Sequence, residues 1–299
     1  MKRPIFTGLC TALVTPFFEG KVNFPMLEVL LRRQMEAGVD AVVLAGTTGE
    51  SATLTKEEKL EIFRRGVEIC RGRCKVIAGT GSNCTATAVE LGREAQECGV
   101  DGILVVTPYY NKTTQPGLVK HYSAICGAVD IPVLAYSVPS RTGMDISVET
   151  CRALAEIPNL AGIKEASGDI SKVGRILADC GSALQVYSGN DDQTVAVMAL
   201  GGLGVISVVS NVVPGAMKAL VGAAQAGDFE LAAALQRRLL PLMDAMFCQV
   251  NPIPVKEAMG MMGLDCGECR MPLDGLTAEN RVRLRKCLDE LSGSAYNKG

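Results

Sequence analysis

The stretch Leu160-Ala161-Gly162-Ile163-Lys164-Glu165-Ala166-Ser167-Gly168-Asp169 starts as a short apolar run and ends in a polar loop. Its lysine stands where the strand-like part meets the loop. In parallel α/β barrels, the carboxyl ends of the strands carry the chemistry. A lysine held in apolar surroundings can lose its proton and attack a carbonyl group to form a Schiff base. A solvated lysine at a strand terminus is the alternative that this segment alone leaves open.

Seven further apolar, β-rich runs occur along the chain, and each ends in turn residues. Amphipathic stretches such as 56–71, 85–98 and 115–129 separate them, so the chain repeats a βα unit. Eight such units predict an α/β fold, the (β/α)8 TIM barrel. The expected strands are 8–14, 41–45, 75–78, 102–106, 132–136, the lysine strand, 184–187 and 203–208.

The chain changes character near residue 223, where the strand-like runs stop. Stretches 229–247 and 255–262 have helical periodicity, and another helix is expected from Thr277, whose hydroxyl can cap it. The sequence therefore predicts a catalytic barrel domain over residues 1–224 and a small C-terminal α-helical domain over 225–299.

Composition and charge exclude several kinds of partner. The net charge is -2 without charge runs, which argues against nucleic acid or anionic membranes. No apolar stretch could span a bilayer and no secretory signal is visible, so we expect a cytoplasmic location. His121 is the only histidine and lies in an expected helix, so we expect it to be structural. The CxxC of Cys266 and Cys269 is a weak redox or metal signal, and we assume no role for it.

The strand ends of the expected barrel meet at one mouth. That mouth would hold one lysine from within a strand, several hydroxyl groups and one arginine, but no cluster of metal ligands. Hydroxyls and backbone N–H groups can bind one carboxylate, and Arg141 can bind another bidentately. The two acids of Asp191-Asp192 disfavour phosphate. The mouth therefore suits a small carboxylate substrate, and no cofactor or metal is expected.

Side-chain alternation along the strands constrains which residues face the mouth. If Lys164 points into the barrel, then Glu165 points outward. If Tyr136 points inward, Ser137 points outward. Purely structural roles are also possible for these residues. Gly46-Thr47-Thr48-Gly49 can be a tight turn, and Tyr136 can be a half-buried aromatic residue.

Five segments of the chain resemble the dihydrodipicolinate synthase family, and they follow the family's order along essentially the whole chain. Each segment alone is weakly specific, but the combination is highly specific. Arg141 and the Tyr109-Tyr110-Asn111 run resemble the synthase branch of the pyruvate-dependent lyases and aldolases, rather than the N-acetylneuraminate lyase branch. The segments are Gly46-Thr47-Thr48-Gly49-Glu50-Ser51, Thr107-Pro108-Tyr109-Tyr110-Asn111-Lys112, Tyr136-Ser137-Val138-Pro139-Ser140-Arg141-Thr142-Gly143, Gly162-Ile163-Lys164-Glu165-Ala166 and Asn251-Pro252-Ile253-Pro254-Val255-Lys256.

The resemblance implies a reaction between pyruvate and L-aspartate 4-semialdehyde. Lys164 would form an imine with pyruvate, and loss of a methyl proton would give an enamine that adds to the aldehyde. The amine of the second substrate would then displace Lys164 and release 4-hydroxy-tetrahydrodipicolinate.

The resemblance also implies roles for other residues and an assembly. Tyr136, Thr48 and Tyr110 match the proton relay of the family, and Tyr110 matches a tyrosine that crosses into the neighbouring subunit's site. A homotetramer built as a dimer of dimers is therefore expected. Thr47 and Thr48 would hold the pyruvate carboxylate, Arg141 the semialdehyde carboxylate, and Gly189 and Ile206 would line the lysine.

The chain departs from the family at two places. The family often has asparagine where Ser137 stands, and its outward orientation suggests that the change is tolerated. The feedback site of lysine-inhibited members is matched at Ser51, Ala52, Asn83 and Tyr109, but Lys56 and Lys59 replace histidines and Thr87 replaces a glutamate. Two extra cations and a lost carboxylate disfavour a cationic ligand, so we expect weak or absent inhibition by lysine.

Three other functions are alternatives to the synthase. A Schiff-base aldolase or lyase for another aldehyde, N-acetylneuraminate lyase-like, would share the lysine chemistry. A catalytically silent ligand-binding barrel would be favoured if Lys164, Tyr136 or Thr48 were missing, and all are present. A metal-dependent hydrolase is disfavoured by the lack of histidine ligands.

Overall fold

The computed structural model describes residues 2–292 and confirms the predicted barrel. Its eight parallel strands close on themselves, since β1 pairs with both β10 and β4. The strands are buried along almost their whole length, as expected for parallel strands covered by helices. They are β1 (Gly8–Ala12), β4 (Ala41–Leu44), β5 (Lys75–Gly79), β6 (Gly102–Val106), β7 (Val133–Ser137), β8 (Leu160–Glu165), β9 (Gln185–Ser188) and β10 (Gly204–Ser207).

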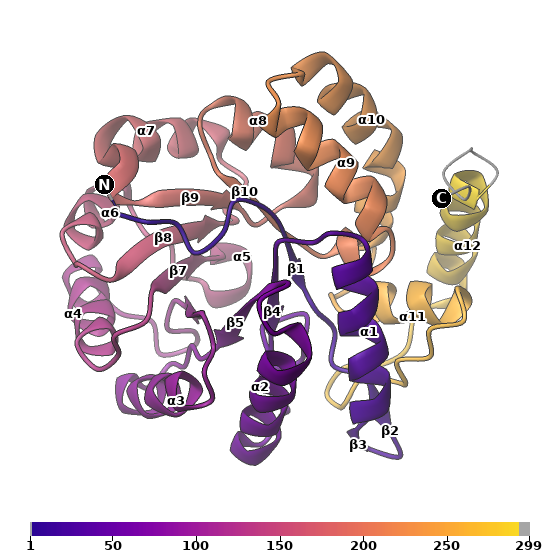
Figure 1. Cartoon of the computed structure of the whole chain (residues 1–299), viewed down its shortest axis with the longest axis horizontal. Helices are drawn as coiled ribbons and strands as arrows, with labels where there is room; N and C mark the ends of the chain where they lie inside the picture. Colours follow the sequence, from indigo (N-terminus) through magenta and orange to yellow (C-terminus); the bar gives the residue numbers. More distant parts are fainter. Residues whose placement is uncertain (1, 293–299) are drawn as a thin grey trace.

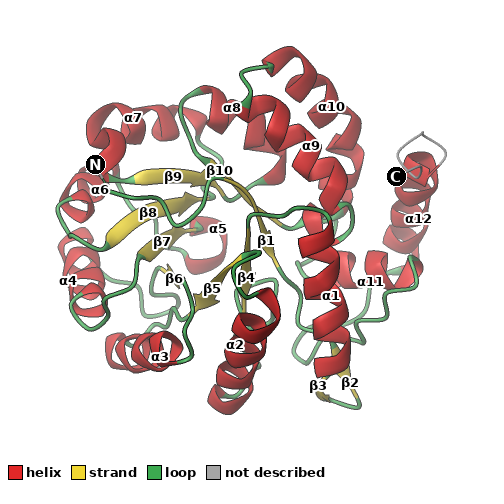
Figure 2. Ribbon diagram, in the orientation of Figure 1, coloured by secondary structure: helices red, strands yellow, loops and turns green. Residues whose placement is uncertain are grey.

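Helices surround the strands, as Figures 1 and 2 show. The helices of the barrel part are α1 (Phe24–Glu36), α2 (Lys56–Cys70), α3 (Thr85–Glu97), α4 (Gln115–Cys126), α5 (Pro139–Thr142), α6 (Val148–Ala155), α7 (Ile170–Cys180), α8 (Thr194–Ala199) and α9 (Pro214–Gln225). Short 3-10 turns η1 (Gly181–Ala183), η2 (Asp191–Gln193) and η3 (Val209–Asn211) follow strands or helices.

Polar caps explain where several helices begin. Thr55 and Glu58 form a reciprocal capping box at the start of α2. The side chains of Ser147, Asp169 and Asp228 each accept a hydrogen bond from a backbone N–H in the first turn of the following helix. These caps satisfy N–H groups that have no partner within the helix.

Apolar side chains form two separate cores. The larger core lies between strands and helices and includes Ala135 and Ile163. The smaller core fills the barrel interior and contains Tyr136, Tyr187 and Ile206. Tyr187 is anchored there by a 2.7 Å hydrogen bond to the carbonyl of Phe6. The separation confirms the expected alternation, because neighbouring residues of one strand belong to different cores.

The strand ends differ from the expectation by one or two residues at most positions. The first strand ends at Ala12 rather than residue 14, although Leu13 still donates to the carbonyl of Val43. The fifth begins at Val133, because Pro132 has no N–H to offer the sheet. The small hairpin of β2 (Phe17–Phe18) and β3 (Lys21–Val22) was not predicted.

The C-terminal part is helical, as expected. It contains α10 (Phe229–Ala245), α11 (Ile253–Met261) and α12 (Ala278–Ser292). Helix α10 packs against α8 and α9, and α12 packs against α10 and α11. Figure 1 shows this orange and yellow part gathered on one side of the barrel. The expected boundary at 224/225 falls at the last residue of α9, and the last residues of the expected C-terminal domain lie outside the described range. No helix among residues 2–292 is long and apolar enough to cross a membrane.

Candidate active site

Lys164 and Tyr136 lie side by side at the carboxyl end of the barrel. They are paired in register across β7 and β8, so both side chains point inward. The Nζ atom of Lys164 lies 4.3 Å from the centroid of the Tyr136 ring. Lys164 is only 5% exposed, which excludes the solvated terminal lysine that the sequence left open. A buried amine beside a phenol is the arrangement that Schiff-base chemistry needs.

Glu165 and Ser137 point to the outside of the barrel, as alternation predicted. Glu165 forms a 2.9 Å ion pair with Lys172 on α7. Ser137 donates a 2.7 Å hydrogen bond to Asp145. Ser137 therefore lies away from the mouth, as its expected outward orientation predicted.

The loop after β4 brings Thr48 into the site. Ala45 and Glu50 have φ angles of +48° and +55°, so a left-handed residue stands on either side of the threonines. Thr48 is buried, whereas Thr47 is half-buried. The Oγ1 atom of Thr48 accepts a 2.9 Å hydrogen bond from Nδ2 of Asn251.

Arg141 reaches the same neighbourhood from α5, the short helix after β7. Its guanidinium donates a 3.2 Å hydrogen bond to the main-chain carbonyl of Asn251. The residue is otherwise exposed, so its remaining N–H groups can meet a ligand. Thr48 and Arg141 thus both contact one residue of the C-terminal part.

Gly189 and Ile206 form the wall next to the lysine. A Cβ atom on Gly189 would lie 3.1 Å from Cε of Lys164 and 2.6 Å from Cβ of Ala166, so only glycine fits without movement. The N–H of Gly189 also donates to the carbonyl of Glu165 at 2.7 Å. Ile206 is fully buried in the interior core.

Tyr110 is not part of this cluster within one chain. It is 93% exposed and has a left-handed backbone conformation, with φ of +69°. The role of Tyr110 in another subunit's site stays a prediction.

Asp191 is buried, and one of its carboxylate oxygens is bonded to the protein backbone. Its Oδ2 accepts hydrogen bonds from the N–H groups of Val208 and Val209, at 2.9 and 3.0 Å. Burial raises the pKa of Asp191 above its usual value. One of the two acids that the sequence assigned to the mouth therefore links η2 to the start of η3.

The residues that match the feedback site lie at or near the surface on α2, α3 and three loops. Ser51, Asn83 and Lys59 are half-buried, and Ala52, Lys56, Thr87 and Tyr109 are exposed. Lys56 forms ion pairs with Glu90 and Glu94 of α3, at 2.5 and 2.7 Å. The charge of Lys56 is therefore compensated. The expected weak binding of a cation then depends mainly on the amine of Lys59 and on the missing carboxylate at Thr87.

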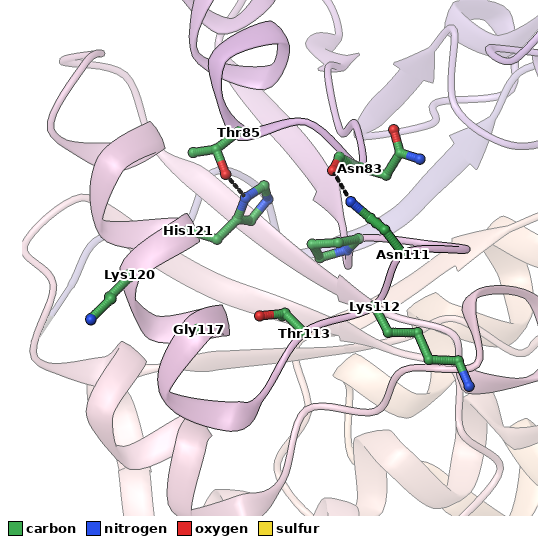
Figure 3. Close-up of a pocket in the computed structure, with 9 residues that line it drawn as sticks. Asn83, Thr85, Asn111, Lys112, Thr113, Gly117, Lys120 and His121 are labelled. Atoms are coloured by element: carbon green, nitrogen blue, oxygen red, sulfur yellow. Dashed lines mark hydrogen bonds between the residues drawn. The ribbon is translucent and has the colours of Figure 1, made fainter.

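A polar pocket of about 360 Å³ lies outside the mouth, between α3, α4 and the loop after Tyr110. Figure 3 shows His121 in it, with Nδ1 2.9 Å from the Thr85 hydroxyl, and Asn111 bonded to the carbonyl of Asn83. Burial lowers the pKa of His121. The pocket lining does not include Lys164, and the contact with Thr85 connects His121 on α4 to the first residue of α3.

The two cysteines of the CxxC motif are held as thiols rather than as reactive thiolates. Cys266 and Cys269 are free thiols, and burial raises their pKa values to about 11 and about 12. Among residues 2–292, no group of three or more His, Cys, Asp or Glu side chains could hold a metal ion.

Sequence reasoning missed how the C-terminal part enters the site. Asn251 and Lys256 belong to a segment of family resemblance, but no role was expected for either. Lys256 forms a 2.9 Å ion pair with Glu50, in which both side chains are at most 3% exposed. Both contacts cross about two hundred residues of sequence, so no local periodicity could indicate them.

The whole chain is similar to known proteins. The family model "Dihydrodipicolinate synthetase family" matches residues 5–291. A 4-hydroxy-tetrahydrodipicolinate synthase of Caldicellulosiruptor saccharolyticus is 49% identical over 286 residues, covering 95% of this chain and 97% of that protein. The solved Aquifex aeolicus dihydrodipicolinate synthase is 43% identical, with a TM-score of 0.94 over 96% of this chain and 98% of the other. A chloride-inhibited Acinetobacter baumannii synthase, solved with pyruvate, is 41% identical, with a TM-score of 0.94 over 96% and 99% of the two chains. The chain therefore belongs to the dihydrodipicolinate synthetase family.

Proposed function

We propose that this chain has 4-hydroxy-tetrahydrodipicolinate synthase activity and condenses pyruvate with L-aspartate 4-semialdehyde. It is a lyase of the Schiff-base, pyruvate-dependent class and acts in diaminopimelate and lysine biosynthesis. The observation that carries this proposal is the buried Lys164 beside Tyr136, in a chain 49% identical to a synthase of that name.

Lys164 is the nucleophile. Its neutral amine adds to the ketone carbon of pyruvate, and loss of water gives a protonated imine. That imine draws electrons from the methyl carbon, so a methyl proton leaves and an enamine forms. The enamine carbon bonds to the aldehyde carbon of the semialdehyde. Finally the substrate's own amine attacks the imine carbon, the bond to Lys164 breaks, and the ring closes.

Each of these steps moves a proton, and one lysine cannot accept and return all of them. Tyr136 lies against Lys164, and Thr48 is buried in the same mouth. The third relay member is Tyr110 of the partner subunit. Its exposure of 93% supports this role, because a tyrosine held away from its own barrel is free to enter another site.

The two substrate carboxylates have separate binding groups. Thr47 and Thr48 hold the pyruvate carboxylate through the backbone N–H groups of the loop after β4, which leaves the Thr48 hydroxyl to the relay. Arg141 binds the semialdehyde carboxylate with the N–H groups that Asn251 does not use. Gly189 and Ile206 shape the wall beside the imine.

The division of the chain follows from these roles. Residues 1–224 form the catalytic domain, and residues 225–299 form a helical domain that supports it. A homotetramer built as a dimer of dimers would place each Tyr110 at a neighbouring site. The enzyme works in the cytoplasm, and its mechanism calls for no cofactor.

Reductive trapping tests the central step. The protein is incubated with pyruvate and borohydride, and its intact mass and peptides are measured. A pyruvate-derived adduct on Lys164 is expected, and Lys164→Arg should abolish it. A folded protein that forms no adduct would leave the silent binding barrel as the better reading.

Arg141→Ala separates the synthase from an aldolase that uses another aldehyde. The variant should keep imine formation with pyruvate while losing most turnover with the semialdehyde. Unchanged turnover would show that this arginine does not select the second substrate.

A further inference from the structure

Asn251 connects two parts of the site that lie far apart in the sequence. It is only 5% exposed. Its side-chain Nδ2 donates to Oγ1 of Thr48 at 2.9 Å, and its main-chain carbonyl accepts from Arg141 at 3.2 Å. One residue of the C-terminal part therefore contacts both a proposed relay group and a proposed substrate-binding group.

The position of Asn251 is fixed by the ion pair that follows it. Lys256, at the start of α11, forms its buried 2.9 Å pair with Glu50, two residues after Thr48. The second oxygen of Glu50 accepts a 2.8 Å hydrogen bond from the N–H of Arg270. The segment 251–256 is therefore held against the loop 48–50 at two points, which leaves the Asn251 carboxamide little freedom.

The direction of the bond between Asn251 and Thr48 determines what the threonine can do. A hydroxyl has one hydrogen to donate and two lone pairs that can accept. Because Thr48 accepts from Asn251, its single hydrogen remains available for another acceptor. Within residues 2–292, the structure contains no hydrogen bond donated by that hydroxyl. The Thr48 hydroxyl can therefore donate its hydrogen to another group in the active site.

We propose that Asn251 is a positioning residue that sets the direction of proton transfer through Thr48. The carboxamide occupies one lone pair of the hydroxyl, so that Thr48 donates its hydrogen toward the tyrosines of the relay. The main-chain carbonyl of Asn251 holds Arg141 at the same time. This inference rests on the proposed function, because it assigns Thr48 to the relay.

An aspartate at this position would reverse the bond. Asn251→Asp keeps the shape of the side chain and the main-chain carbonyl but replaces the N–H donor by an oxygen. The Oδ1 of Asn251 has no hydrogen-bond partner in the described part of the chain, so nothing else there would hold the new carboxylate. The carboxylate would attract the Thr48 hydrogen to itself and take it out of the relay.

The experiment measures kcat, KM and the rate of pyruvate trapping in Asn251→Asp and Asn251→Ala. Both variants should lose about tenfold or more in kcat and in the trapping rate, as expected for a disturbed proton relay. The KM for the semialdehyde should stay within about twofold, since Arg141 is held by the main chain rather than by the side chain. Asn280→Asp is the matched control, because Asn280 bonds only within the C-terminal part and the change adds the same charge. It should keep wild-type kcat.

A kcat unchanged in both Asn251 variants would overturn the inference, and so would a raised KM at constant kcat. Thermal unfolding checks that both variants fold. If the alanine variant does not fold, the kinetics of the isosteric Asn251→Asp variant decide the question. In a Thr48→Val background, Asn251→Asp should slow trapping no further, whereas an additive loss would show that Asn251 acts independently of Thr48. Absence of any adduct in the wild-type protein would instead reject the proposed function.

Discussion

The Nζ atom of Lys164 lies over the face of the Tyr136 ring, 4.3 Å from the ring centroid. The two residues are register partners on β7 and β8, so the sheet itself sets their approach. Packing of the buried lysine against the ring fixes the position of its amine before substrate arrives. Tyr136 is therefore the phenol-bearing residue beside the amine whose protons have to be moved.

Tyr136→Phe should separate the ring from its hydroxyl. The ring would still hold Lys164, so the adduct with pyruvate should still form, but more slowly. Loss of the general acid–base group should lower kcat by about 10²–10⁴-fold. Steady-state kinetics and trapping rates measure the two effects. A variant with wild-type kcat would remove Tyr136 from the relay.

Gly189→Ala should displace the lysine. The added Cβ would meet Ala166 Cβ at 2.6 Å, and the carbonyl of Glu165 and Cε of Lys164 at 3.1 Å, so the wall or the lysine has to move. A misplacement of about 1 Å can cost about 10²-fold in rate, and we expect a loss of that order in trapping and in kcat.

Gly215→Ala is the control for that substitution. It makes the same change in α9, where nothing lies within 4 Å of the added atom. Its trapping rate should equal that of the wild type. Equal rates in the Gly189 variant would show that the wall tolerates a methyl group.

The barrel could be predicted from sequence because its signals are local. Each strand is an apolar run that ends in turn residues, and the position of Lys164 at one such end already indicates the mouth. Alternation also placed Glu165 and Ser137 correctly, because the period of a strand is two.

The rest of the site depends on contacts between distant segments. The pairing of Lys56 with Glu90 and Glu94 joins two helices, and the sequence alone presented Lys56 as an uncompensated cation. Asn251 and Lys256 reach the loop after β4 from the C-terminal part. Periodicity describes one element at a time and therefore carries no information about such contacts.

Lys256→Met should destabilise the protein strongly. The change leaves Glu50 buried without its cation, and breaking one partner of a buried ion pair costs about 3–5 kcal/mol. The free energy of unfolding from urea titration gives the loss. Lys286→Met is the matched control, because its pair with Glu290 is 3.9 Å long and exposed, and such pairs contribute about 0–1 kcal/mol. A similar small effect at Lys256 would mean that Glu50 is stabilised by the N–H of Arg270 alone.

L-Lysine should inhibit this enzyme weakly or not at all. At the positions that match the feedback site, Lys56 is already paired with Glu90 and Glu94, whereas Lys59 forms no ion pair among the described residues. Burial lowers the pKa of Lys59, but an amine remains where a cationic ligand would need an acceptor. Thr87 offers a hydroxyl in place of a carboxylate, so the ligand's ammonium group gains no charge partner there.

Initial rates at millimolar L-lysine test this expectation, and the wild-type rate should fall by less than about twofold. Thr87→Glu should increase the inhibition, because a carboxylate on the exposed first turn of α3 restores an attraction for a cation and lies at the favourable end of the helix dipole. Thr87→Gln keeps the size of that side chain without the charge and should leave inhibition unchanged. Strong inhibition of the wild type would show that Ser51, Asn83 and Tyr109 suffice to bind lysine despite the neighbouring amines.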